Sequence, residues 1–375
     1  MVRRRSAPGI PAPGGTVPGM TEVRARVREL GVPLTGVPGP WNAITDVPGV
    51  QVGHVTLIEG EDVRTGVTAV LPRGREGVGV PCAAGWYALN GNGEMTGTTW
   101  VEETGSLAVP VLLTNTYAVG PVHRGVVEWL GRHRADAAPE WLLPVVTETW
   151  DGYLNDIHGP AVRPGHAAAA IEAAASGPVA EGCVGGGTGM RCYGFKGGVG
   201  TASRVVPYGE DRYTVGVHLQ ANFGARHELV VAGVPVGRGL PPAREAGRVP
   251  PGAGSVVVVV ATDAPLLPGQ CKALARRVPL GLARTGTTGS HFSGDLFLAF
   301  STANESALTS TFPEKDGPAP YETLRFVPWG RIDPFCTAVV EAVEEAVLNA
   351  LTAARSTTGR AGHHVPALPL ELLRR

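Results

Sequence analysis

Residues 254–261, GSVVVVVA, decide the fold of this chain of 375 residues. The apolar run that follows Ser255 predicts a buried β-strand, because valine is β-branched and fits a packed sheet. Before it, residues 237–254 (GRGLPPAREAGRVPPGAG) hold so many prolines and glycines that they predict an exposed loop, of the kind at which chains are cut. Ser255 therefore stands where an exposed segment becomes a buried strand, and this junction is the candidate boundary along the chain.

Cleavage between Gly254 and Ser255 would make Ser255 a new N-terminus that carries both a hydroxyl group and a free α-amine. An α-amine has an unperturbed pKa of about 7.7–8.0, so it can accept a proton at neutral pH. A serine hydroxyl is a weak nucleophile until a neighbouring base takes its proton, and a terminal amine is one such base. The alternative is that Ser255 only begins a strand after a turn, as serine commonly does.

The composition excludes several classes of function. The formal net charge is −1 and only 17% of residues are charged, which argues against a nucleic-acid partner because phosphate binding requires a concentrated basic surface. No apolar run approaches the roughly 18 residues of a membrane span, so no membrane partner is expected. The cysteines show no Cys-x-x-Cys spacing, which predicts neither disulfides nor a zinc site and favours a cytoplasmic protein with reduced thiols. They are Cys82, Cys183, Cys192, Cys271 and Cys336.

The hydrophobic pattern predicts a layered α/β protein. Strands are expected at residues 44–58 (interrupted by Pro48-Gly49), 66–71, 107–113, 142–147, 213–221, 228–236, 255–261 and 295–301. Helices are expected at residues 21–31, 122–134, 165–175, 269–278 and 335–354, the last with an apolar stripe of Val339, Val343, Val347 and Leu351. Residues 1–20 are expected to be a disordered tail, and residues 356–375 to be flexible.

Two polar groups flank the predicted strands. Ser293 and Asp295 precede an apolar run, and alternation along an extended chain puts both on one side of the backbone. A hydroxyl and a carboxylate so placed can polarise a second serine or an amine; the alternative is that Asp295 only caps backbone donors in a turn. Asn222 ends the strand 213–221, where its amide can stabilise an oxyanion, although asparagine before Phe-Gly is also an ordinary turn signal.

Residues 148–156 (ETWDGYLND) gather three carboxylates, two aromatic rings and an amide after an apolar strand. Carboxylates and aromatic faces both attract cations, so this segment is a candidate site for the ammonium group of a substrate. A solvated loop is the alternative interpretation.

The glycine-rich residues 185–198 do not form a phosphate-binding loop, because no Gly-Lys-Ser/Thr follows at the required spacing. They are typical of backbone that passes close to an active site or another chain. Lys196, one of three lysines in the chain, carries an ammonium group that could hold a carbonyl or a carboxylate. Structural histidines without a metal are expected, because no metal-ligand spacing is found among His54, His123, His158, His166, His218 and His291.

Together these segments resemble the L-aminopeptidase/D-esterase family, which includes the β-aminopeptidases. The resemblance runs in order from about Trp41 to Asn304 and is far more specific than any single motif. It is carried by residues 148–156, 185–200 (GGGTGMRCYGFKGGVG), 220–224 (QANFG), 254–267 (GSVVVVVATDAPLL), 281–286 (GLARTG) and 293–304 (SGDLFLAFSTAN).

The resemblance implies a four-layer α-β-β-α sandwich of the kind found in N-terminal-nucleophile hydrolases. It also implies a precursor that cuts itself after Gly254. Residues 21–254 would then form the α-chain part, and residues 255–375 the β-chain part, of one catalytic domain. The two chains would stay together, and the αβ units would form a homo-oligomer without a metal or an organic cofactor.

The resemblance also implies roles for individual residues. Ser255 would be the nucleophile, Ser293 and Asp295 would support it, and Asn222 would donate to the oxyanion. The family's acidic partner can be glutamate, and Asp295 is one methylene shorter.

Tyr153 or Trp150 would line the substrate site, and Glu148 is the candidate to hold the amine of the substrate. The expected function is that of an aminopeptidase or amidase, with possible esterase activity, that acts on small peptides, amino acid amides or esters through an acyl-enzyme on Ser255. The N-terminal residue of the substrate can be an L-α, D-α or β amino acid.

Three alternatives remain at this point. An acyltransferase of the ornithine acetyltransferase type shares this architecture, but such enzymes usually present threonine at the cleavage point. An endo-acting amidase on β-linked or synthetic oligomers would cut within a chain instead of at its N-terminus. A non-catalytic protein of the same fold would bind a small molecule and remain uncut.

Overall fold

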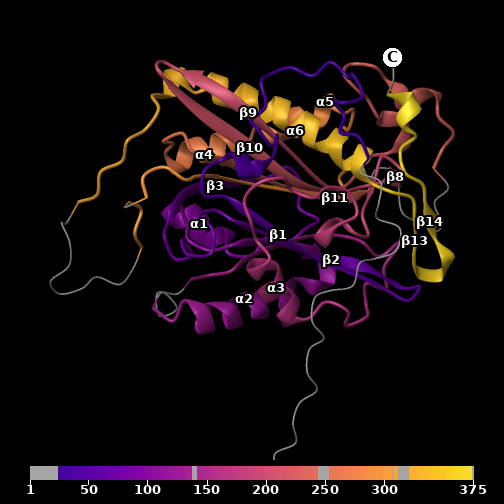
Figure 1. Cartoon of the computed structure of the whole chain (residues 1–375), viewed down its shortest axis with the longest axis horizontal. Coiled ribbons are helices and arrows are strands. Elements are labelled where there is room, and N and C mark those ends of the chain that lie inside the picture. The colour runs from indigo at the N-terminus through magenta and orange to yellow at the C-terminus, as the bar shows by residue number, and fades with distance from the viewer. Residues whose placement is uncertain (1–23, 137–141, 244–252, 306, 311–320, 374–375) are drawn as a thin grey trace, which may run out of the picture.

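The computed structural model describes residues 24–136, 142–243, 253–305, 307–310 and 321–373 (Figure 1). The helices are α1 (Thr98–Thr104), α2 (Val119–His133), α3 (Pro164–Glu172), α4 (Pro268–Ala275), α5 (Val278–Arg284) and α6 (Asp333–Ala353). The strands are β1 (Gln51–Glu59), β2 (Val63–Leu71), β3 (Cys82–Ala88), β4 (Ser106–Leu107), β5 (Val111–Asn115), β6 (Val145–Thr149), β7 (Arg191–Cys192), β8 (Phe195–Lys196), β9 (Gly198–Tyr208), β10 (Asp211–Asn222), β11 (Gly254–Thr262), β12 (Ser293–Ser301), β13 (Thr357–Thr358) and β14 (His364–Val365). The predicted tail, residues 1–20, lies outside the described residues.

Two larger sheets form the body of the molecule. One has the strand order β1-β2-β5-β6, and the other has the order β4-β3-β12-β11-β10-β9. β11 lies inside the larger sheet, antiparallel to β10 and parallel to β12. The helices α4, α5 and α6 cover the larger sheet, while α2 and α3 cover the smaller one (Figure 1). The prediction of a layered α/β protein is therefore confirmed.

The valine run of β11 is buried on both faces, which explains why it carries no polar residue. Val256 and Val258 pack into the core beneath α6, whereas Val257 and Val259 pack into a second core with residues of β1, β2 and β5. A third core lies between the smaller sheet and the helices α2 and α3. The apolar stripe predicted on α6 is confirmed, since all four of its members are fully buried.

Three strand predictions differ from the structure, and in the first of them residues Ile44–Asp46 of the predicted strand 44–58 form a short 3₁₀-helix. The run 107–113 divides into β4 and β5, which belong to different sheets, because Pro110 between them has no N–H for a ladder. The predicted strand 228–236 is wrong. Glu228 instead accepts a hydrogen bond from the Ala225 N–H at 2.7 Å, and Gly233 adopts a positive φ of 80°, so the chain forms tight turns. The strands β3 and β9 were not predicted from the sequence.

The described part of the predicted helix 21–31 forms turns instead of a helix. Arg24 donates to the carbonyl oxygens of Ala354 and Leu368, and Arg26 donates to the carbonyl of Thr201 at 2.7 Å. These distant contacts fix the segment, since a helix this short is marginal by itself. The flexibility expected for residues 356–375 is also not found in residues 356–373, where Leu368 is fully buried.

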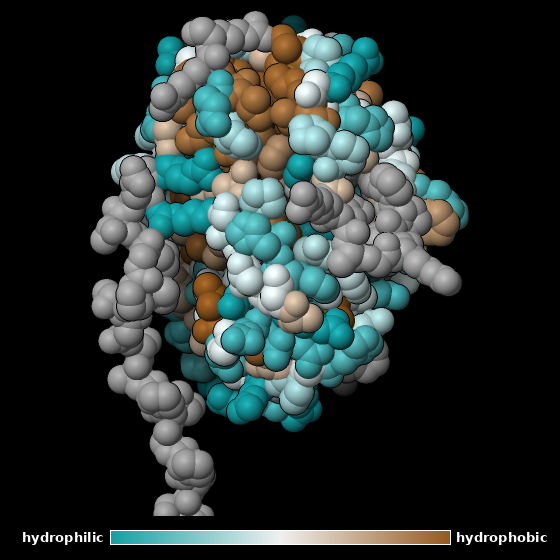
Figure 2. All heavy atoms as spheres, turned by 90° about the vertical axis from the view of Figure 1, so that its right-hand side faces the viewer, coloured by the Kyte–Doolittle hydropathy of each residue, from teal (hydrophilic) through white to brown (hydrophobic). Residues whose placement is uncertain are grey.

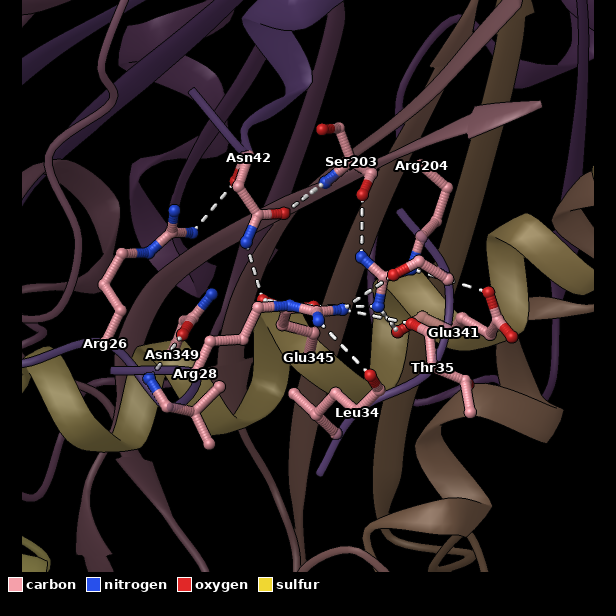
Figure 3. Close-up of polar contacts among 12 residues, drawn as sticks. Arg26, Arg28, Leu34, Thr35, Asn42, Ser203, Arg204, Glu341, Glu345 and Asn349 are labelled. Carbon is pink, nitrogen blue, oxygen red and sulfur yellow. Dashed lines mark hydrogen bonds and ion pairs between the residues drawn. The ribbon is translucent and has the colours of Figure 1, made fainter. Parts of the chain in front are cut away.

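A buried ionic cluster joins the N-terminal segment and β9 to α6 (Figure 3). Both carboxylate oxygens of Glu345 accept from the Arg28 guanidinium at 2.8 Å, and Arg204 lies 2.8 Å from Oε2. The Asn42 amide adds a donor at 2.6 Å. Glu345 and Arg204 are each about 1% exposed, so this cluster is part of the core.

The surface is mixed in character. Figure 2 views the side on which the β13–β14 hairpin lies in Figure 1; hydrophobic residues gather in its upper part, and hydrophilic residues cover most of its lower part. No helix in the described part of the chain is both long and apolar enough to cross a bilayer.

Candidate active site

A cavity of about 390 Å³ opens at the first residues of β11, the strand that was predicted to carry the nucleophile. This volume suits a small organic molecule, because small-molecule pockets commonly measure about 300–1,000 Å³. It is lined by Asn92, Thr116, Tyr117, Glu148, Trp150, Arg191, Gly194, Asn222, Phe223, Gly224, Ala253, Gly254, Ser255 and Phe292. Five of the predicted site residues thus meet here: Gly254, Ser255, Asn222, Glu148 and Trp150.

Ser255 and Asn222 are direct cross-strand partners on β11 and β10. Their side chains therefore share one face of the sheet, with Cβ atoms about 4.5–5.5 Å apart. The backbone of Trp150 contacts both, since its main-chain N–H donates to Ser255 Oγ at 3.2 Å and its carbonyl accepts from Asn222 Nδ2 at 2.9 Å. The Arg191 N–H donates to Asn222 Oδ1 at 2.9 Å, which fixes the amide orientation. Nδ2 carries a second hydrogen, which a substrate oxygen can accept.

Only glycine fits at position 254. A Cβ atom added there would overlap the backbone oxygen of Asn222 on the neighbouring strand. The Gly254 N–H faces the Phe292 carbonyl at 3.4 Å, so the residue before Ser255 lies within the sheet. The carbonyl of Gly254 is therefore held by the same strands that hold the hydroxyl of Ser255. Of the predicted loop before it, residues 244–252 lie outside the described residues.

Ser293 and Asp295 lie on β12, the strand parallel to β11. Their side chains share one side of the strand, as alternation predicts, and Ser293 Oγ donates to Asp295 Oδ1 at 2.5 Å. In the register Val256 lies beside Asp295, so these side chains are on the sheet face opposite to the Ser255 hydroxyl. No hydrogen bond described for either residue reaches Ser255 Oγ. Burial raises the pKa of Asp295, while Ser293, Asn90 and the Val256 backbone N–H oppose this effect.

Glu148 is a buried carboxylate at the end of β6, with 2% of its surface exposed. Oε1 accepts from the Glu94 N–H at 3.1 Å, and Oε2 accepts from the hydroxyl of Thr116. Burial raises the pKa of Glu148, and these two hydrogen bonds partly counteract it. A carboxylate on the wall of a cavity can bind an ammonium group, as the sequence of this segment predicts.

The two aromatic candidates occupy different places. Trp150 lines the cavity, whereas Tyr153 is 8% exposed and is not among the lining residues. The Tyr153 ring stacks on His363 with a centroid distance of 4.5 Å, and the Arg191 guanidinium lies 4.1 Å from the centre of the same ring. Tyr153 therefore contacts the wall of the cavity through Arg191.

Lys196 holds carbonyl oxygens of its own chain. Its Nζ donates to the carbonyls of Met190 at 2.8 Å, Gly197 at 2.9 Å and Gly187 at 3.2 Å, and the residue is fully buried. Burial lowers the pKa of Lys196. The glycine-rich segment thus folds around this ammonium group, and Lys196 is not among the residues that line the cavity.

Two of the histidines, fully buried His218 and half-buried His54, lie between the sheets with ring centroids 6.0 Å apart. Among the described residues, no group of three or more His, Cys, Asp or Glu side chains is placed to hold a metal ion. The structure gives these histidines a place in the core instead of in the cavity.

Several lining residues were missed from the sequence. Thr116 and Tyr117 follow β5, and Asn92 and Phe292 lie in loops before α1 and β12; their spacing in the sequence gave no signal. Arg191 lies within the glycine-rich segment that the sequence associated with an active site, but its own charge was overlooked. These residues come from separate loops that meet only in the folded chain.

The chain is similar in sequence and in structure to a family of known peptidases. Residues 42–365 match the model of peptidase family S58. The β-peptidyl aminopeptidase of Sphingosinicella microcystinivorans is 49% identical over 369 residues, which cover 93% of this chain and 91% of that protein.

Two solved structures are also similar over 93% of this chain. A β-aminopeptidase of Burkholderia sp. has a TM-score of 0.85 and 46% identity, and 97% of that chain is covered. The L-aminopeptidase D-Ala-esterase/amidase of Ochrobactrum anthropi, described as a variant of the N-terminal-nucleophile hydrolase fold, has a TM-score of 0.83 and 44% identity over 96% of its chain. These matches confirm the resemblance predicted from the sequence.

Proposed function

Since the chain belongs to peptidase family S58, and is a serine aminopeptidase of the N-terminal-nucleophile type, we propose that it activates itself by cutting the Gly254–Ser255 bond. The observation that carries this proposal is the position of Ser255. Its hydroxyl faces a cavity beside the Asn222 amide, while the preceding position accepts only glycine. The α-chain would comprise residues 1–254, with residues 21–254 in the catalytic domain, and the β-chain would comprise residues 255–375.

Self-cleavage proceeds in two steps, an acyl shift from nitrogen to oxygen and the hydrolysis of the resulting ester. Ser255 Oγ attacks the carbonyl carbon of Gly254, and the Ser255 nitrogen leaves as an amine after it takes up a proton, which gives an ester between Gly254 and Oγ. Water then hydrolyses this ester, which leaves a carboxylate on Gly254 and a free α-amine on Ser255. An amine next to its own hydroxyl can serve as the general base for the mature enzyme.

Substrate hydrolysis uses the same atoms. The α-amine takes the proton of Oγ, Oγ attacks the substrate carbonyl, and the second N–H of Asn222 Nδ2 stabilises the oxyanion. The proton then goes to the leaving amine or alcohol, and water hydrolyses the acyl-enzyme. We propose that Ser293 and Asp295 bind the freed α-amine of Ser255. On the neighbouring strand they lie beside Gly254 and Val256, the residues on either side of Ser255.

Glu148 binds the ammonium group of the substrate, and Trp150 packs beside it. Substrates are therefore short peptides, amino acid amides or esters with a free amine, in agreement with the β-peptidyl and L-amino acid substrates in the names of the relatives. We also propose that the αβ units assemble into a homo-oligomer. The hydrophobic residues in the upper part of Figure 2 support this, since exposed apolar patches are typical of interfaces. We further assign the two sheets and their covering helices to a four-layer α-β-β-α sandwich, and the protein to the cytoplasm.

Intact-mass measurement tests self-cleavage directly. Wild-type protein is expected to give two masses, for chains that end at Gly254 and begin at Ser255, and to hydrolyse an amino acid amide. Ser255→Ala is expected to remain one chain without this activity, because neither the nucleophile nor the new amine can form.

Ser310→Ala is the matched control, since Ser310 is exposed, does not line this cavity and should leave cleavage unchanged. Cleavage at the same bond in Ser255→Ala, or amide hydrolysis by that variant, would contradict the proposal.

A further inference from the structure

Asp151 carries a fully buried carboxyl group that the chemistry at Ser255 does not use. It follows Trp150 in the chain, but it is not among the residues that line the cavity. Its Oδ1 accepts from Asn155 Nδ2 at 3.0 Å. Burial raises the pKa of Asp151 to about 7, while hydrogen bonds from Thr65, Asn155 and Asn115 oppose this effect. Because a buried carboxyl group costs free energy unless it is hydrogen-bonded, these contacts indicate what the group does there.

The first route from Asp151 to the cavity is the peptide unit that it shares with Trp150. The carbonyl of this unit accepts from Asn222 Nδ2 at 2.9 Å, and the main-chain N–H of Trp150 donates to Ser255 Oγ at 3.2 Å. A peptide unit is planar, so the position of Asp151 sets the direction of the carbonyl that holds the Asn222 amide. Asp151 is fixed on its other side as well, since its own carbonyl accepts from the Asn155 N–H at 3.0 Å.

The second route leads through Thr65 and Asn115 to Glu148. Thr65 is fully buried on β2, where its hydroxyl interacts with Asp151 and accepts from Asn115 Nδ2 at 2.9 Å. Asn115 Oδ1 in turn accepts from two backbone N–H groups of the turn Thr116–Ala118. The hydroxyl of the first residue of this turn donates to Glu148 Oε2. The carboxylate that binds the amine of the substrate is therefore joined to Asp151 by a chain of hydrogen bonds.

The glycine-rich segment packs directly on Asp151. A Cβ atom added at Gly189 would lie 2.8 Å from Asp151 Cβ, so no side chain fits at this position. Two residues further along, the Arg191 N–H donates to Asn222 Oδ1 at 2.9 Å. Both hydrogen bonds described for the Asn222 side chain therefore come from segments that adjoin Asp151, one from Trp150 and one from Arg191.

We propose that Asp151 is a positioning residue, whose hydrogen bonds hold the nucleophile, the oxyanion donor and the amine-binding carboxylate in their places around the cavity. The proposal rests on the proposed function of Ser255 and adds a residue that does not touch the substrate. It requires that loss of the Asp151 carboxyl group slows both self-cleavage and hydrolysis, although every residue of the cavity wall is still present.

Two variants of Asp151 test the proposal. Wild-type protein is given the p-nitroanilides of L-, D- and β-alanine, and the best of them is used throughout. Intact mass followed over time gives the rate of self-cleavage, and kcat is expressed for each cleaved molecule. We expect Asp151→Ala to lower both rates about 10- to 100-fold, because a displacement of about 1 Å can cost about 100-fold. Asp151→Asn keeps an oxygen that accepts from Asn155, so it should stay within about threefold of the wild type.

Asp151→Asn also separates positioning from a role as a counter-ion. Asp151 raises the pKa of the buried Lys196 ammonium group, so the two groups lie near one another. A counter-ion needs its charge, whereas a positioning residue needs its shape and its hydrogen bonds. A loss in Asp151→Asn as large as that in Asp151→Ala would overturn the proposal in favour of the ion pair.

Thr65→Val tests the second route by itself. This change keeps the shape of the side chain but removes the hydroxyl that joins Asp151 to Asn115. We expect KM for the anilide to rise about three- to tenfold, because Glu148 is then held less firmly, while kcat changes less than about threefold. A purely structural role would not divide the effect between KM and kcat in this way.

Asp46→Ala is the matched control. The Asp46 carboxylate also organises a turn of its own chain, since it accepts from the Trp41 N–H at 2.9 Å and from Ser203 Oγ at 2.6 Å. Asp46 is not among the residues that line the cavity. Its replacement should lower the stability of the protein but leave kcat for each cleaved molecule unchanged.

The outcomes separate the two proposals. Wild-type rates in a folded Asp151→Ala, or equal losses of kcat in Asp151→Ala and Asp46→Ala, would overturn the role of Asp151 while Ser255 keeps its function. If circular dichroism shows that Asp151→Ala does not fold, Thr65→Val decides, and an unchanged KM in that variant would overturn the proposal. Failure of the wild type to cut itself would overturn the function of Ser255 and this inference with it.

Discussion

Hydrogen bonds fix the orientation of the Ser255 hydroxyl and of the amide beside it. Trp150 donates to its Oγ, and Trp150 and Arg191 together fix the Asn222 amide beside it. Glu148, the carboxylate among the described lining residues of the cavity, is fixed in turn by Thr116 and the Glu94 backbone. Each of these contacts joins segments that are distant in the sequence.

Glu148→Gln removes the charge of this carboxylate and keeps its size. We expect KM for an amine-bearing amide to rise about tenfold or more, because a hydrogen bond to a charged group contributes about 1.5–3 kcal/mol. Burial raises the pKa of Glu148, and protonation removes its attraction for ammonium. The KM of the wild type should therefore rise as the pH falls through this pKa, and the variant should not show this rise. Steady-state kinetics over the acidic pH range measure both.

Glu94→Gln is the control for Glu148, since the side chain of Glu94 is exposed and only its backbone bonds Glu148. It should keep the rise of KM at low pH. Identical pH profiles for wild type and Glu148→Gln would exclude Glu148 from amine binding.

At the scale of the elements, β10 has two tasks. Its end carries Asn222 into the cavity, and its middle carries His218 into the core, opposite His54 of β1. Burial lowers the pKa of His218 from 6.5 to about 3 and that of His54 to about 4. Both rings are therefore neutral in the folded protein at neutral pH.

His218→Leu is expected to change how stability depends on pH. Below pH 6.5 the histidine of the unfolded chain takes up a proton while folded His218 stays neutral, so the wild type loses free energy of unfolding until the pH reaches about 3. The variant lacks this loss. Asp151 and Glu181, whose pKa values burial raises to about 7, act in the opposite sense but equally in both proteins. Urea unfolding at several pH values should show the wild type losing stability relative to the variant as the pH falls.

His227→Leu is the control, because His227 is exposed and should give the pH dependence of the wild type. A stability difference between wild type and His218→Leu that stays constant with pH would show that His218 titrates normally.

At the scale of the whole molecule, the ionic cluster joins the two parts that cleavage would separate. Its arginines, Arg28 and Arg204, precede Ser255, and its carboxylate, Glu345, lies on α6 after it (Figure 3). In addition, α6 packs on β9 and β10, while β11 lies between β10 and β12. Cleavage would therefore leave two chains that share one sheet and one core.

Glu345→Gln should lower the free energy of unfolding by roughly 3 kcal/mol, because it removes the carboxylate that pairs with part-exposed Arg28 and leaves buried Arg204 only the longer contact with Glu341 at 3.5 Å. Urea unfolding of the cleaved protein, followed by separation of the chains, measures this loss. Glu128→Gln is the matched control, since Glu128 pairs with Arg124 and Arg132 on the exposed side of α2 and should contribute at most about 1 kcal/mol. Equal losses in the two variants would contradict a role for the cluster in holding the chains together.

Local pattern predicted the elements whose signals are strong. The valine run gave β11, and the stripe of four apolar residues gave α6, because one periodicity persists over the whole element. The run at 21–31 misled because its capping signals were overridden by contacts with distant segments, and the run at 228–236 misled because local turn contacts and the positive φ of Gly233 break its apolar pattern. The short β-strands around the glycine-rich segment gave no periodic signal at all.

The sequence alone determined the layered α/β class and the family resemblance, and it predicted the junction at Ser255 as the place of the nucleophile, since each of these signals lies in consecutive residues. Tertiary structure decided which polar groups meet there. Asn222 faces Ser255 because β10 pairs with β11, Trp150 lines the cavity while Tyr153 supports Arg191, and Ser293 and Asp295 lie on the opposite face of the sheet. The physical reason is that strand pairing sets the register between distant segments, and one residue of register moves a side chain to the other face.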